Sequence, residues 1–455
     1  MEWFESLIAT IGNIVWGPVT LILIVGTGIL LTFRLGFLQI RDLPYALKLT
    51  FSKSDKEKKN KGDISHFQSL MTAMAATLGI GNMTGVASAI LMGGVGALFW
   101  MWLAAFFGMA TKYGEAILAV KYRVTNHKGE ISGGPMYYIE KGLGWKWLAV
   151  LFALFGFLAS FGIGNMTQAN TVAGALSANF DINPWITGFV LMVLTGIVLL
   201  GGIKGIGRVS AIFVPFMALF YLAGGVVIIL MNITEVPAAF ALIISEAFNP
   251  SAAAGGAIGM AIRYGVARGV FSNEAGLGSA PIAAAAAKTD YPGRQALVSM
   301  TGTFMDTIIV CTVTGLAIVM SGIYTGHGDA SSLTGDAFEF FLPGVGNYIV
   351  IFGIILFAYS TIIGWSYYGE KCFGYLFGDH RTIIYKVVFV GVVMLGAGLK
   401  LELVWNIADI FNALMAIPNL IALLLLSGVI VSETKKFQEV RKKERLEVKR
   451  KKMAS

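Results

Sequence analysis

Long stretches almost free of charged residues recur along the whole chain. The first, residues 14–33, runs twenty residues without Asp, Glu, Lys or Arg. A helix needs about 20 mainly apolar residues to cross the hydrocarbon core of a bilayer, which is about 30 Å thick. Only 13% of the residues are charged and 56% are hydrophobic, whereas a typical soluble domain has about 25% charged residues. The pattern therefore predicts an all-α polytopic membrane protein.

Hydropathy predicts about eleven transmembrane helices in a single membrane domain. They lie near residues 14–33, 66–92, 96–120, 147–176, 184–203, 209–231, 257–287, 295–321, 346–369, 383–399 and 406–432. Residues 14–33 are expected to form an extra N-terminal helix. The alternative is a cleaved signal peptide, but Glu2 and Glu5 precede the stretch where a signal would carry Lys or Arg.

The positions of Lys and Arg predict how the chain is oriented. Intervals 34–65 and 121–146 carry eight and five of these residues, while 177–183, 232–256 and 322–345 carry none. Cytoplasmic loops are enriched in Lys and Arg, so the N-terminus is predicted outside and the C-terminus in the cytoplasm of a cell-membrane protein. The tail, residues 433–455, holds ten Lys or Arg, which is more typical of contact with anionic lipid than with nucleic acid.

Two of the predicted helices contain the same glycine pattern. The second has Gly79-Ile-Gly81-Asn82, and the seventh has Gly276-Leu-Gly278-Ser279. Glycines let the backbone leave helical geometry, which frees N–H and C=O groups that lipid cannot satisfy. Half-helix N-termini can then receive a carboxylate, and unwound carbonyls can hold an ammonium group or Na⁺. For either motif alone, close packing between helices is the alternative.

The two breaks together predict a five-plus-five inverted repeat. Counting five helices from each break gives units 66–231 and 257–432. Because each unit has an odd number of helices, the second begins on the opposite side of the membrane. Corresponding breaks in two halves are a sequence indication of a transporter whose binding site lies at the bilayer midplane.

Two further stretches resemble the alanine or glycine:cation symporter family. They are GGVGALFWMWLAAFFG at residues 93–108 and SNEAGLGSAP at residues 272–281, and the resemblance covers nearly all of the chain. It implies sodium-coupled import of alanine or glycine by alternating access, and the inverted-repeat fold first known from a bacterial leucine transporter. It also implies Na⁺ as the co-transported ion, no other cofactor or metal, and a lipid bilayer as the surroundings.

The breaks also resemble those of that leucine transporter, which has Gly-Leu-Gly-Asn at the first and Phe-Thr-x-x-x-Gly-x-Gly at the second. The likeness implies that the substrate contacts Thr77, Gly79, Gly81, Phe271, Ser272, Asn273 and Gly276, with the Gly79 and Gly81 amides receiving its carboxylate. It implies one cation beside Asn82 and Ser272, and a second between carbonyls of Ala75 and Leu78 and hydroxyls of Ser360 and Thr361. These ligands are all neutral oxygens, which suit Na⁺.

Other polar residues within the predicted helices add candidates. Gln168 in the fourth helix is expected to contact the substrate, although an interhelical hydrogen bond worth about 0.6 kcal/mol is the alternative. Glu274 is expected to pair with Arg263 and Arg268, because an unpaired charge in a membrane is costly; the alternative is that it shapes the break or takes part in cation coupling. Asp306 and Asp409 fit either gate partners or structural ion pairs, and the sequence leaves this open.

There are three alternatives to sodium-coupled symport. Proton coupling is the first, because Glu274, Asp306 and Asp409 could each titrate. A channel is the second, with the glycine-rich breaks lining a continuous pore. An enzyme is the third, but the chain has no HExxH or GxSxG motif in a suitable context.

Overall fold

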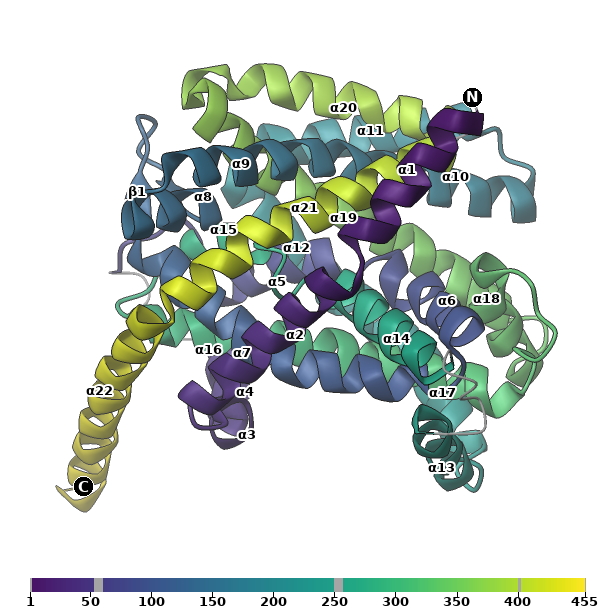
Figure 1. Ribbon diagram of the computed structural model, residues 1–455, viewed down its shortest axis with the longest axis horizontal. Coiled ribbons are helices and arrows are strands. Elements are labelled where there is room, and N and C mark those ends of the chain that lie inside the picture. The colour runs from purple at the N-terminus through teal and green to yellow at the C-terminus, as the bar shows by residue number, and fades with distance from the viewer. Residues whose placement is uncertain (1, 53–59, 249–256, 400–401, 455) are drawn as a thin grey trace.

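The computed structural model describes residues 2–52, 60–248, 257–399 and 402–454, and most of them are in helices. Within those ranges the strands form a single two-stranded hairpin, β1 (Val124–Thr125) and β2 (Ile131–Ser132), paired antiparallel. Figure 1 shows the long helices packed into one bundle, from which α22 (Ser427–Ala454) extends away. The expectation of an all-α protein is confirmed.

The remaining helices follow one another with short connections. The first half of the chain contains α1 (Glu2–Val15), α2 (Pro18–Arg34), α3 (Leu38–Arg41), α4 (Leu43–Phe51), α5 (His66–Thr77), η2 (Ile80–Asn82), α6 (Thr84–Gly93), α7 (Ala97–Lys121), α8 (Pro135–Tyr138), η3 (Ile139–Leu143), α9 (Lys146–Phe161), η4 (Gly162–Met166), α10 (Thr167–Phe180), α11 (Pro184–Leu200) and α12 (Gly202–Met231). The second half contains α13 (Val236–Ala247), α14 (Ala257–Asn273), α15 (Ala280–Ala285), α16 (Pro292–Thr303), η6 (Phe304–Cys311), α17 (Thr312–Ser321), α18 (Ala330–Phe341), α19 (Gly346–Phe377), η7 (Asp379–Arg381), α20 (Thr382–Gly398) and α21 (Glu402–Leu425).

Seven helical stretches among the described residues are long and apolar enough to cross a membrane. They are Ala97–Lys121, Lys146–Phe180, Gly202–Met231, Pro292–Ser321, Gly346–Phe377, Asp379–Gly398 and Asn406–Leu425. Shorter apolar helices are Pro18–Arg34, Thr84–Gly93, Pro184–Leu200 and Val236–Ala247. The count of eleven transmembrane helices stays a prediction, because each broken helix consists of pieces that are too short to cross a bilayer on their own.

The predicted N-terminal helix 14–33 is divided in the structure. Helix α1 ends at Val15, and α2 begins at Pro18, which suits the first turn of a helix because that turn needs no N–H donor from it. Helix α1 packs against α21, and α2 packs against α7. Hydropathy alone could not locate this division, because both sides of it are apolar.

Four predicted loops contain helices. Helices α3 and α4 lie in 34–65, α8 and η3 in 121–146, α13 in 232–256 and α18 in 322–345; residues 53–59 and 249–256 of these intervals lie outside the described residues. A hydropathy window of about 19 residues does not detect helices this short. The expected basic tail 433–455 is also helical as far as Ala454, as part of α22.

Both predicted breaks are unwound. Between α5 and η2, Leu78 and Gly79 have extended backbone. Between α14 and α15, Gly276 and Gly278 have φ angles of 90° and 85°, a left-handed conformation that glycine adopts at little cost. Four long apolar helical segments follow each break, interrupted in places by π-helical turns, and α22 comes after the second set. The bounds of the two repeat units stay a prediction.

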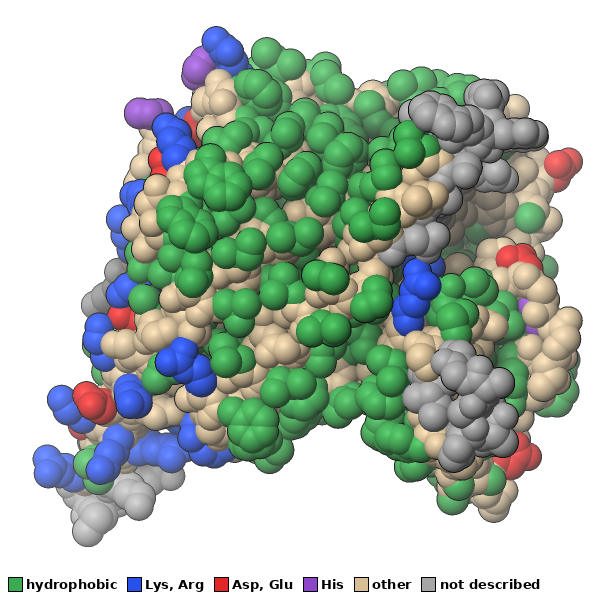
Figure 2. Space-filling model, in the orientation of Figure 1, with side chains coloured by type: hydrophobic (Ala, Val, Ile, Leu, Met, Phe, Trp, Pro, Cys, Tyr) green, Lys and Arg blue, Asp and Glu red, His purple; other side chains and the backbone are tan. Residues whose placement is uncertain are grey.

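The surface separates apolar from basic side chains. Figure 2 shows a broad hydrophobic face, with Lys and Arg gathered along its left edge. Figure 1 places the hairpin and α22 at that same edge, while the N-terminal end of the chain lies toward the other side of the view. An apolar band beside a basic edge is the arrangement expected of a membrane protein whose basic loops share one side.

Candidate functional site

A small central cavity lies between the first break and two residues that precede the second, Phe271 and Glu274. Its lining consists of Ala76, Thr77, Gly79, Ile80, Gly81, Ile163, Gln168, Phe271, Glu274, Thr361, Trp365 and Asn412. Six of these residues were predicted to bind substrate or a cation from the sequence: Thr77, Gly79, Gly81, Gln168, Phe271 and Thr361. The structure therefore brings the core of the predicted site together from α5, η2, α10, α14 and α19.

Glycine at the first break allows an unusually close approach of neighbouring elements. A Cβ atom on Gly79 would lie 2.7 Å from Thr361 Oγ1, and one on Gly81 would lie 3.2 Å from the ring of Phe271 and from the Ser272 Cα. Contacts this short require the neighbours to move. The backbone of this break therefore packs closely against α19 on one side and against the end of α14 on the other.

Asn273 and Gly276 do not line the central cavity. The N–H of Gly276 donates to Glu115 Oε1 at 3.1 Å, and its carbonyl accepts from Asn419 Nδ2 at 2.9 Å. The side-chain amide of Asn273 donates to Thr307 Oγ1 at 3.0 Å. The motif placed both residues at the break, but only the fold decides toward which side the unwound backbone turns.

The residues predicted for the first cation meet at a carboxylate. Asn82 Nδ2 donates to Asp306 Oδ1 at 2.7 Å, and Ser272 Oγ donates to Asp306 Oδ2 at 2.8 Å. Thr307 Oγ1 donates to the same Oδ2 at 2.7 Å. The sequence left the role of Asp306 open and predicted neutral ligands only. The structure places this acidic side chain, which is fully buried, directly against both predicted ligands.

The residues predicted for the second cation also lie together. Ser360 Oγ is 3.0 Å from the carbonyl oxygen of Ala75 and 3.3 Å from that of Leu78. Thr361 Oγ1 is 3.5 Å from the Leu78 carbonyl. Two carbonyls freed at the end of α5 and two hydroxyls of α19 therefore form a compact group of neutral oxygens, a donor set that suits a hard monovalent cation.

Among the three amides of the fourth predicted helix, Gln168 differs from its neighbours. Asn165 and Asn170 donate to carbonyls of Phe389 and Gly396 in α20. Gln168 Nε2 donates to the Ile163 carbonyl at 3.0 Å, while its Oε1 has no partner among the described residues. Because this oxygen lies beside Gly79 in the cavity lining, Gln168 retains hydrogen-bonding capacity toward a ligand there.

Six lining residues were not assigned to the site from sequence, and three of them have hydrogen-bonding side chains: Glu274, Trp365 and Asn412. Glu274 accepts hydrogen bonds from Trp365 Nε1 at 2.9 Å and from Ser279 Oγ at 2.5 Å, so its expected pairing with Arg263 and Arg268 is wrong. Trp365 follows Thr361 by four residues, and this helical spacing could have placed it on the same face of α19. Asn412, in α21, is a polar residue of the last predicted helix, which was itself a usable signal.

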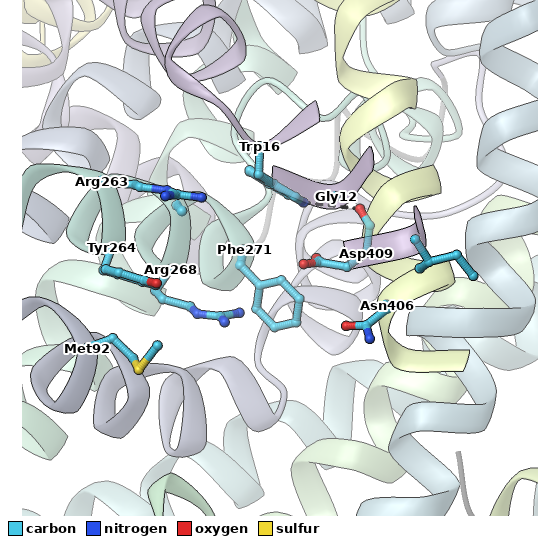
Figure 3. A pocket seen from close by; sticks show the side chains of 11 residues that line it. Gly12, Trp16, Met92, Arg263, Tyr264, Arg268, Phe271, Asn406 and Asp409 are labelled. Atoms are coloured by element: carbon cyan, nitrogen blue, oxygen red, sulfur yellow. Dashed lines mark hydrogen bonds between the residues drawn. The ribbon is translucent and has the colours of Figure 1, made fainter. Parts of the chain in front are cut away.

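An outer pocket of about 310 Å³ adjoins the central cavity, and the two share Phe271. Figure 3 shows Arg263 and Arg268 of α14 on one side of Phe271, with Asp409 and Asn406 of α21 on the other. The Arg268 guanidinium lies 5.7 Å from the centre of the Phe271 ring. A third, inner cavity shares Thr77 with the central one. Phe271 therefore belongs to the linings of both the outer pocket and the central cavity, and Thr77 to those of both the central and the inner cavity.

The sequence profile of the sodium:alanine symporter family matches residues 1–451. The chain belongs to this family. It is 60% identical over 449 residues to the sodium/alanine symporter AgcS of Methanococcus maripaludis, covering 97% of this chain and 99% of that protein. It is 38% identical over 441 residues to the probable sodium/glutamine symporter GlnT of Bacillus subtilis, covering 96% and 91%. The family resemblance noted from the sequence is confirmed.

Among solved structures, MhsT in complex with L-phenylalanine matches with a TM-score of 0.60 and 15% identity, covering 83% of this chain and 93% of that chain. This likeness concerns the fold alone and confirms the expected transporter fold. Family membership makes the protein a multi-pass membrane transporter rather than an enzyme, and it supports sodium-coupled symport of an amino acid.

Proposed function

We propose that this protein imports alanine or glycine together with Na⁺ across the cell membrane by alternating access. The observation that supports the proposal is the central cavity, in which the first unwound segment lies opposite Phe271 and Glu274, near two groups of oxygens that we assign to cations. Unwound backbone at membrane depth is tolerated only where protein or polar ligands satisfy it. A zwitterionic amino acid and Na⁺ supply the matching charges.

Small substrates are favoured by the lack of space around the first break. Gly79 already lies against Thr361, and Gly81 lies against Phe271 and Ser272, so little volume remains for a side chain on the ligand. Among the relatives, AgcS is named for alanine and GlnT for glutamine. The higher identity to AgcS therefore also favours alanine over a larger amino acid.

Asn82 offers a direct link between the cation and the substrate. Its Oδ1 accepts the N–H of Gly79 at 3.1 Å, the same N–H that the family likeness assigns to the substrate carboxylate. In the proposed mechanism, Na⁺ beside Asp306 draws this oxygen away from Gly79. The freed N–H then receives the carboxylate, so cation binding prepares the substrate site.

The series of cavities provides the path. Substrate enters from the outer pocket past Phe271 and leaves through the inner cavity past Thr77. The C-terminal helix and the basic edge face the cytoplasm, and the N-terminus lies outside, in accord with the distribution of Lys and Arg in Figure 2. The apolar face between them contacts lipid.

Uptake of labelled alanine into proteoliposomes tests the proposal, with Na⁺ and pH gradients imposed separately. We expect uptake that saturates, that requires an inward Na⁺ gradient, and that glycine inhibits more strongly than leucine. Uptake that follows the pH gradient without Na⁺ would establish proton coupling instead. Flux that does not saturate would indicate a channel.

Changing Gln168 to Leu tests the substrate site. The substitution removes the amide oxygen beside Gly79, and a hydrogen bond to a charged group is worth about 1.5–3 kcal/mol. We expect the KM for alanine to rise at least about tenfold, with little change in Na⁺ dependence at saturating alanine. Asn170→Ala is the matched control, because that amide bonds the carbonyls of Gly396 and Leu399 instead. An unchanged KM in Gln168→Leu would remove this residue from the site.

A further inference from the structure

Lys112 is a buried cation that the proposed mechanism has not used. It lies on α7, its side chain is 4% exposed, and its Nζ has no hydrogen-bond partner among the described residues. It lines the inner cavity together with Thr77 from the first break and Asn273 from the second. An isolated ammonium group in a low-dielectric interior is costly unless another charge or a polar ligand compensates it. The charge that compensates this ammonium group must therefore come from neighbouring side chains.

The charges that act on Lys112 are those of three buried carboxylates, Glu115, Glu274 and Asp306. Each carboxylate already accepts hydrogen bonds from other groups. Glu115 Oε1 accepts from the N–H groups of Gly276 and Gly278, Glu274 accepts from Trp365 and Ser279, and Asp306 accepts from three side chains. This cluster contains one cation and three acids, so it can accommodate added positive charge.

Two side chains connect the proposed cation site to the cavity that Lys112 lines. Thr307 Oγ1 donates to Asp306 at 2.7 Å and accepts from Asn273 Nδ2 at 3.0 Å. Asn273 in turn lines the cavity that holds Lys112. The ammonium group sits on a flexible four-carbon stem with three donors, and its cavity opens on the break that carries Ser272.

We propose that Lys112 is an internal cation that neutralises the Asp306 site after Na⁺ has left. This inference rests on the proposed function. When Na⁺ binds beside Asn82, Ser272 and Asp306, the ammonium stays in the inner cavity; when Na⁺ departs, the ammonium approaches Asp306 through the position of Asn273. Lys112 therefore competes with Na⁺ for the Asp306 carboxylate. It also compensates this buried charge while the transporter, with neither Na⁺ nor alanine bound, changes back to the state that opens to the outside.

The variant Lys112→Met tests both roles, the competition with Na⁺ and the charge compensation in the unloaded transporter. Removing the competitor is expected to lower the Na⁺ concentration for half-maximal binding at least about fivefold, the lower end of typical coupling between two sites. Net uptake into vesicles free of Na⁺ and alanine is expected to fall at least about tenfold, because that cycle needs the empty carrier to return. Exchange of alanine, with Na⁺ and alanine on both sides, bypasses this step and is expected to persist.

Two controls accompany the experiment. Lys112→Arg keeps the charge and is expected to retain net uptake. Lys121→Met removes a lysine of the same helix whose ammonium bonds Glu433 at 2.7 Å near the surface, and it is expected to leave both transport modes and Na⁺ affinity unchanged.

Na⁺-induced thermal stabilisation of the purified protein measures Na⁺ affinity independently of transport. An unchanged or weaker Na⁺ affinity in Lys112→Met, or equal loss of net uptake and exchange in a stable variant, would overturn the proposal. If Lys112→Met does not fold, Lys112→Gln takes its place in the same binding measurement. Wild-type protein that shows Na⁺ binding but no Na⁺-dependent uptake would refute the proposed function while leaving the competition at Lys112 measurable.

Discussion

Replacing Asp306 with Asn is expected to abolish sodium-driven uptake at physiological Na⁺. The buried carboxylate accepts hydrogen bonds from Asn82 and Ser272, the two residues assigned to the first cation. Asn keeps the size of the side chain but removes its charge. Loss of one partner from a buried charge pair costs about 2–5 kcal/mol, so we expect the half-saturating Na⁺ concentration to rise at least about thirtyfold.

A Na⁺ titration of alanine uptake at fixed pH measures this effect. Ser272→Ala should give a smaller increase, because it removes a neutral oxygen and leaves the carboxylate in place. Asp409→Asn is the matched control: it neutralises a carboxylate that lines the outer pocket and should leave the Na⁺ dependence close to that of the wild type. A wild-type Na⁺ dependence in Asp306→Asn would show that the cation binds elsewhere.

Replacing Glu115 with Leu is expected to destabilise the second break severely. One oxygen of this carboxylate accepts the N–H groups of Gly276 and Gly278 at 3.1 Å each, and Asn419 Nδ2 at 2.7 Å. Leu leaves these three donors unsatisfied at membrane depth, and each unsatisfied buried donor costs about 1–3 kcal/mol. We expect a loss of at least about 3 kcal/mol in the free energy of unfolding.

Thermal unfolding of the detergent-purified protein tests this prediction. Glu115→Gln retains an acceptor oxygen of the same reach, so it should lose less stability than Glu115→Leu. Equal stability of the two variants would show that the hydrogen bonds to the break contribute little. Glu115→Gln should also show whether the charge at this position, beyond the acceptor, matters for transport.

Much of the site could be predicted because it depends on backbone and on local sequence. The glycine motifs at Gly79–Gly81 and Gly276–Gly278 together predicted the two breaks, since glycine lets the backbone leave helical geometry. Family likeness then assigned Ala75, Leu78, Ser360 and Thr361 to one cation, and the structure brings all four together. Apolar runs also predicted where the long helices lie, although α19 continues to Phe377 beyond its predicted end and the predicted helix 406–432 includes both the end of α21 and the start of α22.

Contacts between distant side chains could not be predicted in the same way. Asp306 is 224 positions from Asn82, and no local pattern indicates that they meet. The predicted partners of Glu274 were wrong for the same reason. Arg263 and Arg268 are close to it in sequence, but Trp365, on another helix, donates the hydrogen bond to its carboxylate. Lys112 and Glu115 lie within an apolar helix, and their charge alone was a signal that they required partners.

The sequence by itself determined that this protein crosses a membrane and belongs with sodium:alanine symporters. It also determined that two of its helices are interrupted at glycine-rich points. The membrane crossing and the breaks depend on composition, hydropathy and backbone freedom, and the family resemblance depends on short motifs; all of these are local properties of the sequence. Only the tertiary structure decided that the break at Gly79 faces the cavity while Gly276 turns toward Glu115. It also decided that a carboxylate lies between the proposed sodium ligands. Electrostatic partners depend on which helices pack side by side, and that is a property of the whole fold.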